Sequence, residues 1–182
     1  MPFKEKIFQN NVEQKVAATA RSELAMACAA YAAMTTPQQK AGCIHAMMDV
    51  LDRKLDEKTR WAVMEACGRQ CIGSSTLEKA RRLQQKAQGL DDLLCRLNEA
   101  RIGGGHLLRE ADGIHAAYDH CYCGSVSKAR EPFSDTYCHC SCGWFHQLFE
   151  MLLDRLVEVE LSGSIIQGDE KCRFLIRIQE PG

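Results

Sequence analysis

The chain has 182 residues, a formal net charge of −1 and 7% aromatic residues. A charge near zero, without a basic stretch interleaved with aromatics, argues against nucleic acid as a partner. No apolar run approaches the roughly 20 residues of a membrane span, and the first residues lack the apolar core of a signal peptide. We therefore expect a cytoplasmic protein with no nucleic-acid or membrane partner.

Eleven of the residues are cysteines, an odd number, and many of them fall in segments with a helical pattern. Thiols stay reduced in the cytoplasm, so this is not the pattern of a secreted disulfide framework. Metal binding, thiol chemistry and burial in the core are the three explanations left.

The first hundred residues predict helices. Residues 12–34 are rich in Ala, Glu, Leu and Met and keep a helical stripe of apolar side chains. Thr36 and Gln39 form a capping box around Pro37, which starts a helix that runs to about Leu55.

Two more helices are expected before residue 102. Asp56 can cap a helix over residues 57–71, and Ser75 with Glu78 forms a second capping box. The helix that follows Ser75 carries a leucine stripe, and Gly89 bends or breaks it.

Three consecutive glycines at residues 103–105 would destabilise a helix, and we interpret them as a hinge. They divide the chain into a helical N-terminal region, 1–102, and a second domain, 103–182. The predicted fold class is α+β, a helical N-terminal half followed by an antiparallel β-β-α-β-β half. The expected strands of this second half are 114–123, 136–140, 157–161 and 172–178, and its helix is 143–156.

Five cysteines gather in the second domain, two of them at i, i+2 spacing and three at i, i+2, i+4 spacing. If both runs are strands, alternate residues point to one face and the sulfurs of each run align. If the loop between the runs folds back, these thiols and a nearby imidazole converge into a metal site, with zinc preferred and an iron–sulfur cluster as the alternative. The other explanation is five unconnected thiols, some of them buried. The residues concerned are Cys121, Cys123, Cys138, Cys140, Cys142, His120, His139 and His146.

Cysteines elsewhere have weaker patterns. Cys67 and Cys71 lie one helical turn apart and share a face with Trp61. Burial explains them, and the alternative is a dithiol that closes a pocket or supplies further ligands. Cys172 begins the apolar face of the last strand, where burial and metal ligation are equally good explanations.

The order of motifs in the second half resembles a known family. Cys-Gly-Trp at residues 142–144 opens a helix, Val-x-Val-Glu-Leu follows at 157–161, and Ile-Ile-x-Gly-Asp-x-x-Cys-x-Phe follows at 165–174. Together they resemble the 4-vinyl-reductase-type small-molecule-binding domain, over roughly residues 103–179. This domain occurs in bacteriochlorophyll-related proteins, in archaeal proteins and in the sensor halves of phenol-responsive transcription activators. The resemblance implies a small-molecule-binding or sensor-like protein.

The same resemblance implies a structural zinc beside the pocket. Its ligands would be one of the three cysteines at 138–142, then Glu160, a third ligand near Gly163, and Cys172. Glycine has no ligand atom, so Cys121 or Cys123 would have to take the third place. A simple hairpin would also set Glu160 across from about Arg177, and that ion pair would explain Glu160 without a metal.

Two further similarities concern the whole chain and its possible chemistry. Cys67-Gly68-x-x-Cys71-Ile72 and Cys121-Tyr122-Cys123-Gly124 are similar to motifs of uncharacterised cysteine-rich prokaryotic proteins. The Cys-Gly-Trp motif with its helix is distantly similar to the L-2-amino-thiazoline-4-carboxylate hydrolase family, which implies an enzyme.

We therefore expect a protein that binds a small hydrophobic or aromatic ligand beside a cysteine-held structural metal. The aromatic candidates for the pocket are Tyr118, Tyr122, Trp144 and Phe145. The helical half either covers the pocket or forms a homodimer.

The competing hypotheses are enzymes or redox proteins. A hydrolase would use Cys140 or Cys142 as nucleophile, with His139 or His146 as base, or a metal-activated water. Cys142 lies just before the expected helix and therefore at its positive end, which would stabilise its thiolate. A third hypothesis is an iron–sulfur or thiol redox protein.

Overall fold

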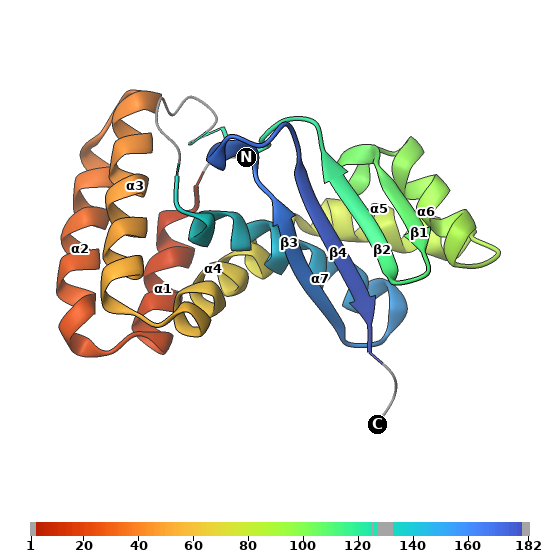
Figure 1. Ribbon diagram of the computed structural model, residues 1–182, viewed down its shortest axis with the longest axis horizontal. Helices are drawn as coiled ribbons and strands as arrows, with labels where there is room; N and C mark the ends of the chain where they lie inside the picture. The colour runs from red at the N-terminus through yellow and green to blue at the C-terminus, as the bar shows by residue number, and fades with distance from the viewer. Residues whose placement is uncertain (1–2, 125, 127–132, 180–182) are drawn as a thin grey trace.

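The computed structural model describes residues 3–124, 126 and 133–179. Helices gather in the N-terminal half of the chain, and an antiparallel sheet with further helices forms the C-terminal half (Figure 1). The predicted fold class, α+β, is confirmed. None of the described helices is long and apolar enough to cross a membrane.

The elements follow one another in two groups. The helical group is α1 (Glu5–Lys15), α2 (Ala18–Ala33), α3 (Pro37–Lys54), α4 (Glu57–Cys71), α5 (Ser74–Gln84) and α6 (Leu90–Glu99). The second group is η1 (Ile102–Gly105), β1 (Leu107–Glu110), β2 (Gly113–Tyr118), η2 (Asp135–Cys138), α7 (His139–Leu153), β3 (Val157–Gly163), η3 (Ile165–Gln167) and β4 (Cys172–Ile178).

The prediction of one helix over residues 12–34 is wrong, because two helices cover this segment. Val16 leaves the helical conformation (φ −111°, ψ 139°), and α2 begins two residues later. The Val16 side chain is buried in the core, so tertiary packing rather than helix propensity decides where the chain turns.

The start signals of the next two helices are confirmed. Gln39 N donates to Thr36 Oγ1 at 3.3 Å, and Thr36 N donates to Gln39 Oε1 at 3.2 Å, which completes the capping box. Asp56 Oδ1 accepts from the backbone N–H of Thr59 at 2.9 Å. These short-range bonds depend on local sequence alone, which is why the sequence predicts them.

The predicted capping box of Ser75 and Glu78 is wrong. Helix α5 already begins at Ser74, with Gly73 in the capping position, so no side chain caps it. The predicted break at Gly89 is confirmed: this residue has φ 147° and precedes α6, and a side chain would rarely tolerate that backbone conformation.

The sheet has the strand order β1-β2-β4-β3, and all its neighbours are antiparallel. The two C-terminal strands lie where alternation predicts them, with a register shift between Leu161 and Gly163. Strand β2 ends at Tyr118, so the prediction that it continues through Cys121 and Cys123 is wrong. Its outer neighbour is β1, a four-residue strand too short for a periodic signal.

The predicted strand at residues 136–140 is wrong. These residues form η2 and the first turn of α7, which therefore begins at His139 rather than at residue 143. Ser134 Oγ accepts from the backbone N–H of Thr136 at 3.1 Å and starts this helical turn. The loop expected to fold back between Cys123 and Cys138 lies partly outside the described residues.

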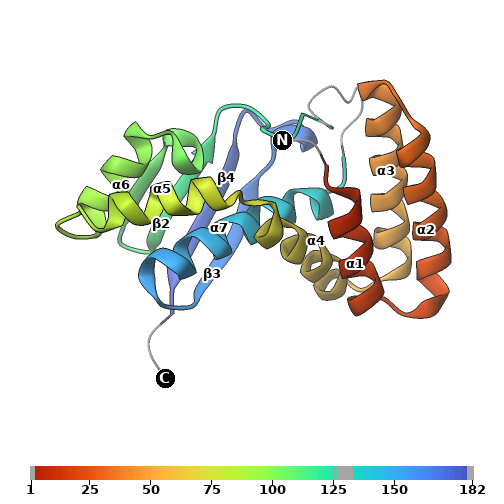
Figure 2. The same cartoon turned by 180° about the vertical axis from the view of Figure 1, so that it is seen from behind.

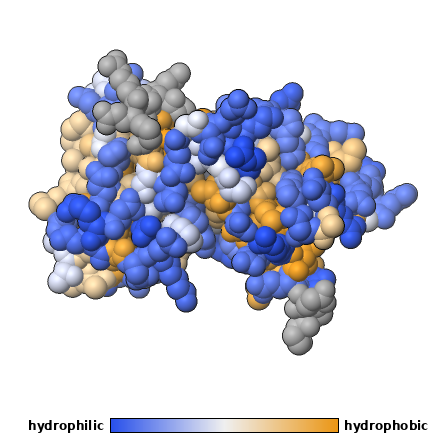
Figure 3. Space-filling model, viewed as in Figure 1, coloured by the Kyte–Doolittle hydropathy of each residue, from blue (hydrophilic) through white to orange (hydrophobic). Residues whose placement is uncertain are grey.

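Buried residues form two clusters. One joins α1–α4 with Tyr137, and the other joins α5, α6, α7 and the sheet. Between Cys67 and Ile72 the chain passes from the first cluster to the second. The division of the chain into two domains at residue 102 stays a prediction. Figure 2, which views the molecule from behind, shows α5, α6 and α7 in front of the sheet, and α4 beside the N-terminal end of α7. Hydrophilic residues cover most of the face in Figure 3.

Candidate functional site

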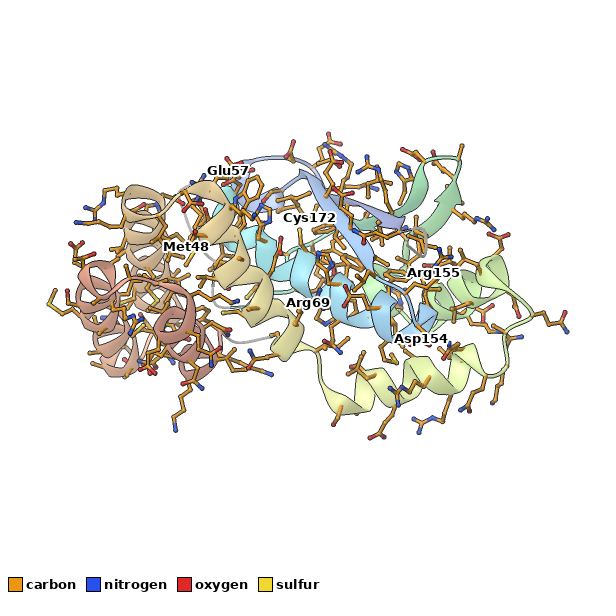
Figure 4. The ribbon with its side chains drawn as sticks, turned by 90° about the horizontal axis from the view of Figure 1, so that it is seen from below. Met48, Glu57, Arg69, Asp154, Arg155 and Cys172 are labelled. Carbon is orange, nitrogen blue, oxygen red and sulfur yellow. The ribbon has the colours of Figure 1, made fainter. Side chains whose placement is uncertain are left out.

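The closest approach between the two halves of the molecule is the crossing of α4 and α7 (Figure 4). Gly68 of α4 faces the backbone of α7, where an added Cβ would collide with the carbonyl oxygen of Cys140. Gly143 of α7 faces α4 in the same way, and its Cβ would collide with the carbonyl oxygen of Glu65. These two glycines allow the C-terminal end of α4 to lie directly against the N-terminal end of α7.

The crossing brings two cysteines together. Cys71 is the last residue of α4 and Cys140 is the second residue of α7, so the contact of Gly68 with the Cys140 backbone brings both cysteines to the same end of the crossing. Hydrogen bonding with Cys140 lowers the pKa of Cys71, which burial alone would raise, and the Lys4 ammonium lowers it further. Hydrogen bonding with Cys71 and burial raise the pKa of Cys140.

Both thiols line a cavity of about 550 Å³. The aromatic part of its wall comes from three side chains, Tyr118, Tyr122 and Trp144, and these were predicted from the sequence. Tyr118 and Tyr122 meet edge to face, with ring centroids 5.1 Å apart. The fourth aromatic candidate, Phe145, is fully buried in the core beneath Tyr118 and lies outside the lining.

The triple glycine forms another wall of the cavity. Gly103 and Gly104 have φ of 78° and 92°, in the left-handed region. A Cβ on Gly104 would collide with the carbonyl oxygen of Ala117 and with the Tyr118 ring. The segment predicted to be a hinge is therefore a tight turn that lies directly against β2 and leaves room for this ring.

The rim of the cavity is positively charged. Lys79, Arg82 and Arg101 line it, and none of the lining residues within the described ranges is acidic. Ser75 and Thr76 line it from the first turn of α5, and Ser141 does so from the first turn of α7. The positive ends of two helices and three cations therefore surround this space, which favours an anionic occupant.

The first predicted cysteine pair lies beside the cavity. Cys123 lines it, and its sulfur lies 2.6 Å from the Tyr137 hydroxyl. Cys121 lies close enough that its thiolate would raise the pKa of Cys123. Burial is the main cause that raises the pKa of both thiols.

Cys138 and Cys172 face away from the cavity toward η3. Cys138 Sγ lies 2.9 Å from Ser164 Oγ, and Cys172 Sγ accepts from the backbone N–H of Ile165 at 3.4 Å. Burial raises the pKa of Cys138 to about 12, and it also raises that of Cys172. The premise that the three cysteines at 138–142 align along a strand is wrong, because a helical turn points them in different directions.

Glu160 forms the cross-strand ion pair that the sequence offered as its alternative role. Arg177 Nη1 donates to Glu160 Oε2 at 2.8 Å, and both side chains are about half exposed. The carboxylate therefore lies on the solvent side of the sheet.

Two of the predicted catalytic candidates, Cys142 and His146, lie outside the lining of the cavity. Cys142 has no exposed surface, and burial raises its pKa, contrary to the expectation for a thiol at a helix start. Burial also lowers the pKa of His146, whose Nδ1 lies 3.5 Å from Glu150 Oε1. His139 is buried and stacks on Trp61, with ring centroids 4.1 Å apart. His120 is exposed and contacts only the ring of Tyr122 among the described aromatic residues.

The metal site remains a prediction. Within the described part of the chain, the one set of three Cys, His, Asp or Glu ligand atoms within 4.8 Å of one another is Glu110, Asp112 and His115, which is largely exposed. No predicted ligand belongs to this set. All eleven cysteines are among the described residues, and each is a free thiol.

The sequence did not single out the residues that distinguish this cavity. The sequence predicts burial for Cys67 and Cys71, with a pocket dithiol as the alternative. The structure places Cys71 in the lining, whereas Cys67 is buried outside it and contacts Asn11. The i, i+4 spacing of Cys67 and Cys71 is the sequence signal that points to this dithiol alternative. Lys79 and Arg82 give no such signal, because α5 carries another exposed cation, and Arg101 is a single arginine between α6 and η1.

Taken together, the molecule is an α+β protein with a thiol-lined, cation-rimmed cavity between its two halves. The chain belongs to the family of unknown function DUF6144, whose model matches residues 1–181. No curated protein and no solved structure matches it.

Proposed function

We propose that this protein binds a small, flat, apolar or aromatic molecule that carries an acidic group. The observation that supports this function is the cavity between α4, α5, η1, β2 and α7. Its volume lies within the range of about 300–1,000 Å³ that is usual for small-molecule sites.

The lining suits a molecule with two unlike ends. The faces and edges of Tyr118, Tyr122 and Trp144 offer apolar contact to a ring. The cationic rim of Lys79, Arg82 and Arg101 lies on α5 and at the start of η1. An acidic group at the rim would gain charge-assisted hydrogen bonds while the ring leaves water.

The resemblance of residues 103–179 to a small-molecule-binding domain supports the same proposal and suggests a sensor-like role. Of the two nucleophiles of the hydrolase hypothesis, Cys142 is buried away from the cavity, whereas Cys140 lines it.

The test is a fluorescence titration of the full chain with 8-anilinonaphthalene-1-sulfonate, a flat aromatic anion. We expect saturable binding of about one probe per chain. The double variant K79Q/R82Q should bind roughly fivefold more weakly, because each lost cation removes about 0.5 kcal/mol of binding free energy. Trp144→Leu should also weaken binding, since it removes an aromatic wall.

Matched controls separate the cavity from the general surface. The double variant K58Q/K86Q makes the same change in net charge at exposed positions outside the cavity. Met26→Ser removes an apolar side chain that is 67% exposed on α2. Both should bind like the wild type. Equal loss in the controls and the cavity variants would overturn the proposal.

A further inference from the structure

We propose that Cys71 and Cys140 are a redox-active dithiol, which forms an intramolecular disulfide when a low-molecular-weight disulfide enters the cavity. This proposal concerns the protein's own thiols and does not depend on the anionic ligand proposed above.

The first argument is the geometry of the pair. The two thiols line one cavity and come from helices whose backbones touch at Gly68 and Gly143. Each thiol lies at a helix end, Cys71 at the last residue of α4 and Cys140 in the first turn of α7. The residue after Cys71, Ile72, already has an extended backbone, so the α4 end can adjust without breaking a helix interior.

The second argument is access. Both thiols line the cavity, and Cys71 is partly exposed. Disulfide exchange requires an attacking thiolate that a solvent-borne disulfide can reach, with a second thiol beside it. Cys140 lines the same cavity, so it lies where that second thiol is needed.

The third argument is that the neighbouring cysteines have other partners. Cys123 faces the Tyr137 hydroxyl, and Cys67 accepts from the Asn11 side-chain amide at 3.7 Å. Within the described residues, no three thiols lie within 4.8 Å of one another. This arrangement favours two-thiol chemistry at this point over a three- or four-thiolate metal site.

The reaction balances as an exchange in two steps. The Cys71 thiolate attacks one sulfur of the small disulfide; a mixed disulfide forms, the original S–S bond breaks, and a thiolate leaves. Cys140 gives its proton to that leaving thiolate and attacks Cys71 Sγ, which releases the second small thiolate. Two protein thiols and one small disulfide thus become one protein disulfide and two small thiols, the second of which takes its proton from solvent.

To test the proposal, the full chain is equilibrated in a series of buffers with different ratios of reduced glutathione to glutathione disulfide. The exchange is quenched with acid, the remaining free thiols are alkylated, and the peptides are identified by mass spectrometry. We expect one cross-linked peptide pair, Cys71 with Cys140, and loss of alkylation at both positions in parallel across the series. Excess reduced glutathione should restore both thiols. This measurement needs no variant, so misfolding cannot mask its result.

Variants then separate the roles of the two thiols. In Cys140→Ser, glutathione should accumulate on Cys71 as a stable mixed disulfide; in Cys71→Ser, Cys140 should stay reduced. Cys95→Ser removes an exposed thiol on α6 and should leave the cross-link unchanged. A disulfide between Cys71 and another cysteine, or oxidation of Cys95 while Cys71 and Cys140 stay reduced, would overturn the proposal.

Discussion

Arg69 of α4 and Glu150 of α7 form a two-pronged ion pair, with Nη1 2.6 Å from Oε2 and Nη2 3.0 Å from Oε1. Figure 4 shows Arg69 at the seam between these helices. The pair holds together the two elements whose ends carry Cys71 and Cys140. Its planar geometry is the kind that Arg and a carboxylate make best.

We expect Glu150→Gln to lower the free energy of unfolding by about 1 kcal/mol at neutral pH. The Arg69 guanidinium holds the pKa of Glu150 below its usual value in the folded state. The pair therefore stabilises the fold above the unfolded pKa, and this contribution is lost as the pH falls through the lower, folded pKa. Urea unfolding of both proteins at several pH values measures the effect.

The matched control is Glu160→Gln, which removes the more exposed partner of Arg177 and should change stability by less than about 0.5 kcal/mol. A difference between Glu150→Gln and the wild type that stays constant from neutral to strongly acidic pH would contradict the assigned cause.

The glycines at the crossing of α4 and α7 give a second prediction. Gly68→Ala should destabilise the protein by about 2–3 kcal/mol, because its Cβ would meet the backbone of Cys140 and the helices would have to separate. Gly42→Ala is the control: it lies inside α3 with open space around it, and it should stabilise by about 0.5–1 kcal/mol. Thermal unfolding of both variants would show opposite shifts, and a stabilised Gly68→Ala protein would refute the close contact.

The reactivity of Cys71 gives a third prediction. The pH at which its alkylation rate by iodoacetamide is half-maximal should lie below the roughly 8.5 of an ordinary cysteine, because Cys140 donates a hydrogen bond to its thiolate. Cys140→Ala should move this midpoint upward, since the donor is gone. Cys28→Ala, a change to a buried thiol in α2, should leave the midpoint where it is. Alkylation followed peptide by peptide measures the midpoint of Cys71 in each protein. An unshifted midpoint in Cys140→Ala would argue against hydrogen bonding between Cys140 and Cys71.

Metal content decides the zinc prediction. If cysteines hold a structural zinc, protein purified without added metal or chelator carries about one zinc per chain and shows no visible absorbance. Cys138→Ser and Cys172→Ser should then lose the metal, whereas Cys95→Ser should keep it. Iron with sulfide would favour the cluster instead, and metal-free protein with titratable thiols would contradict both.

The sequence by itself determined the features that depend on near neighbours. Thr36 and Gln39 cap α3 through bonds spanning three residues, and the alternation of β3 and β4 fixes which side chains reach solvent. The ion pair of Glu160 with Arg177 forms as a diagonal contact on the same face, although the simple hairpin misplaced the register: Glu160 lies opposite Leu175, and Arg177 lies opposite Glu158.

Only the tertiary structure decided which thiols meet. Cys71 and Cys140 are far apart along the chain, and they come together because Gly68 and Gly143 let two helix backbones touch. The segment at residues 136–140 became helical for the same reason, since packing against α4 outweighs the weak strand preference of Thr and Tyr. Contacts between distant segments depend on the shape of both surfaces, and a local pattern carries no information about that shape.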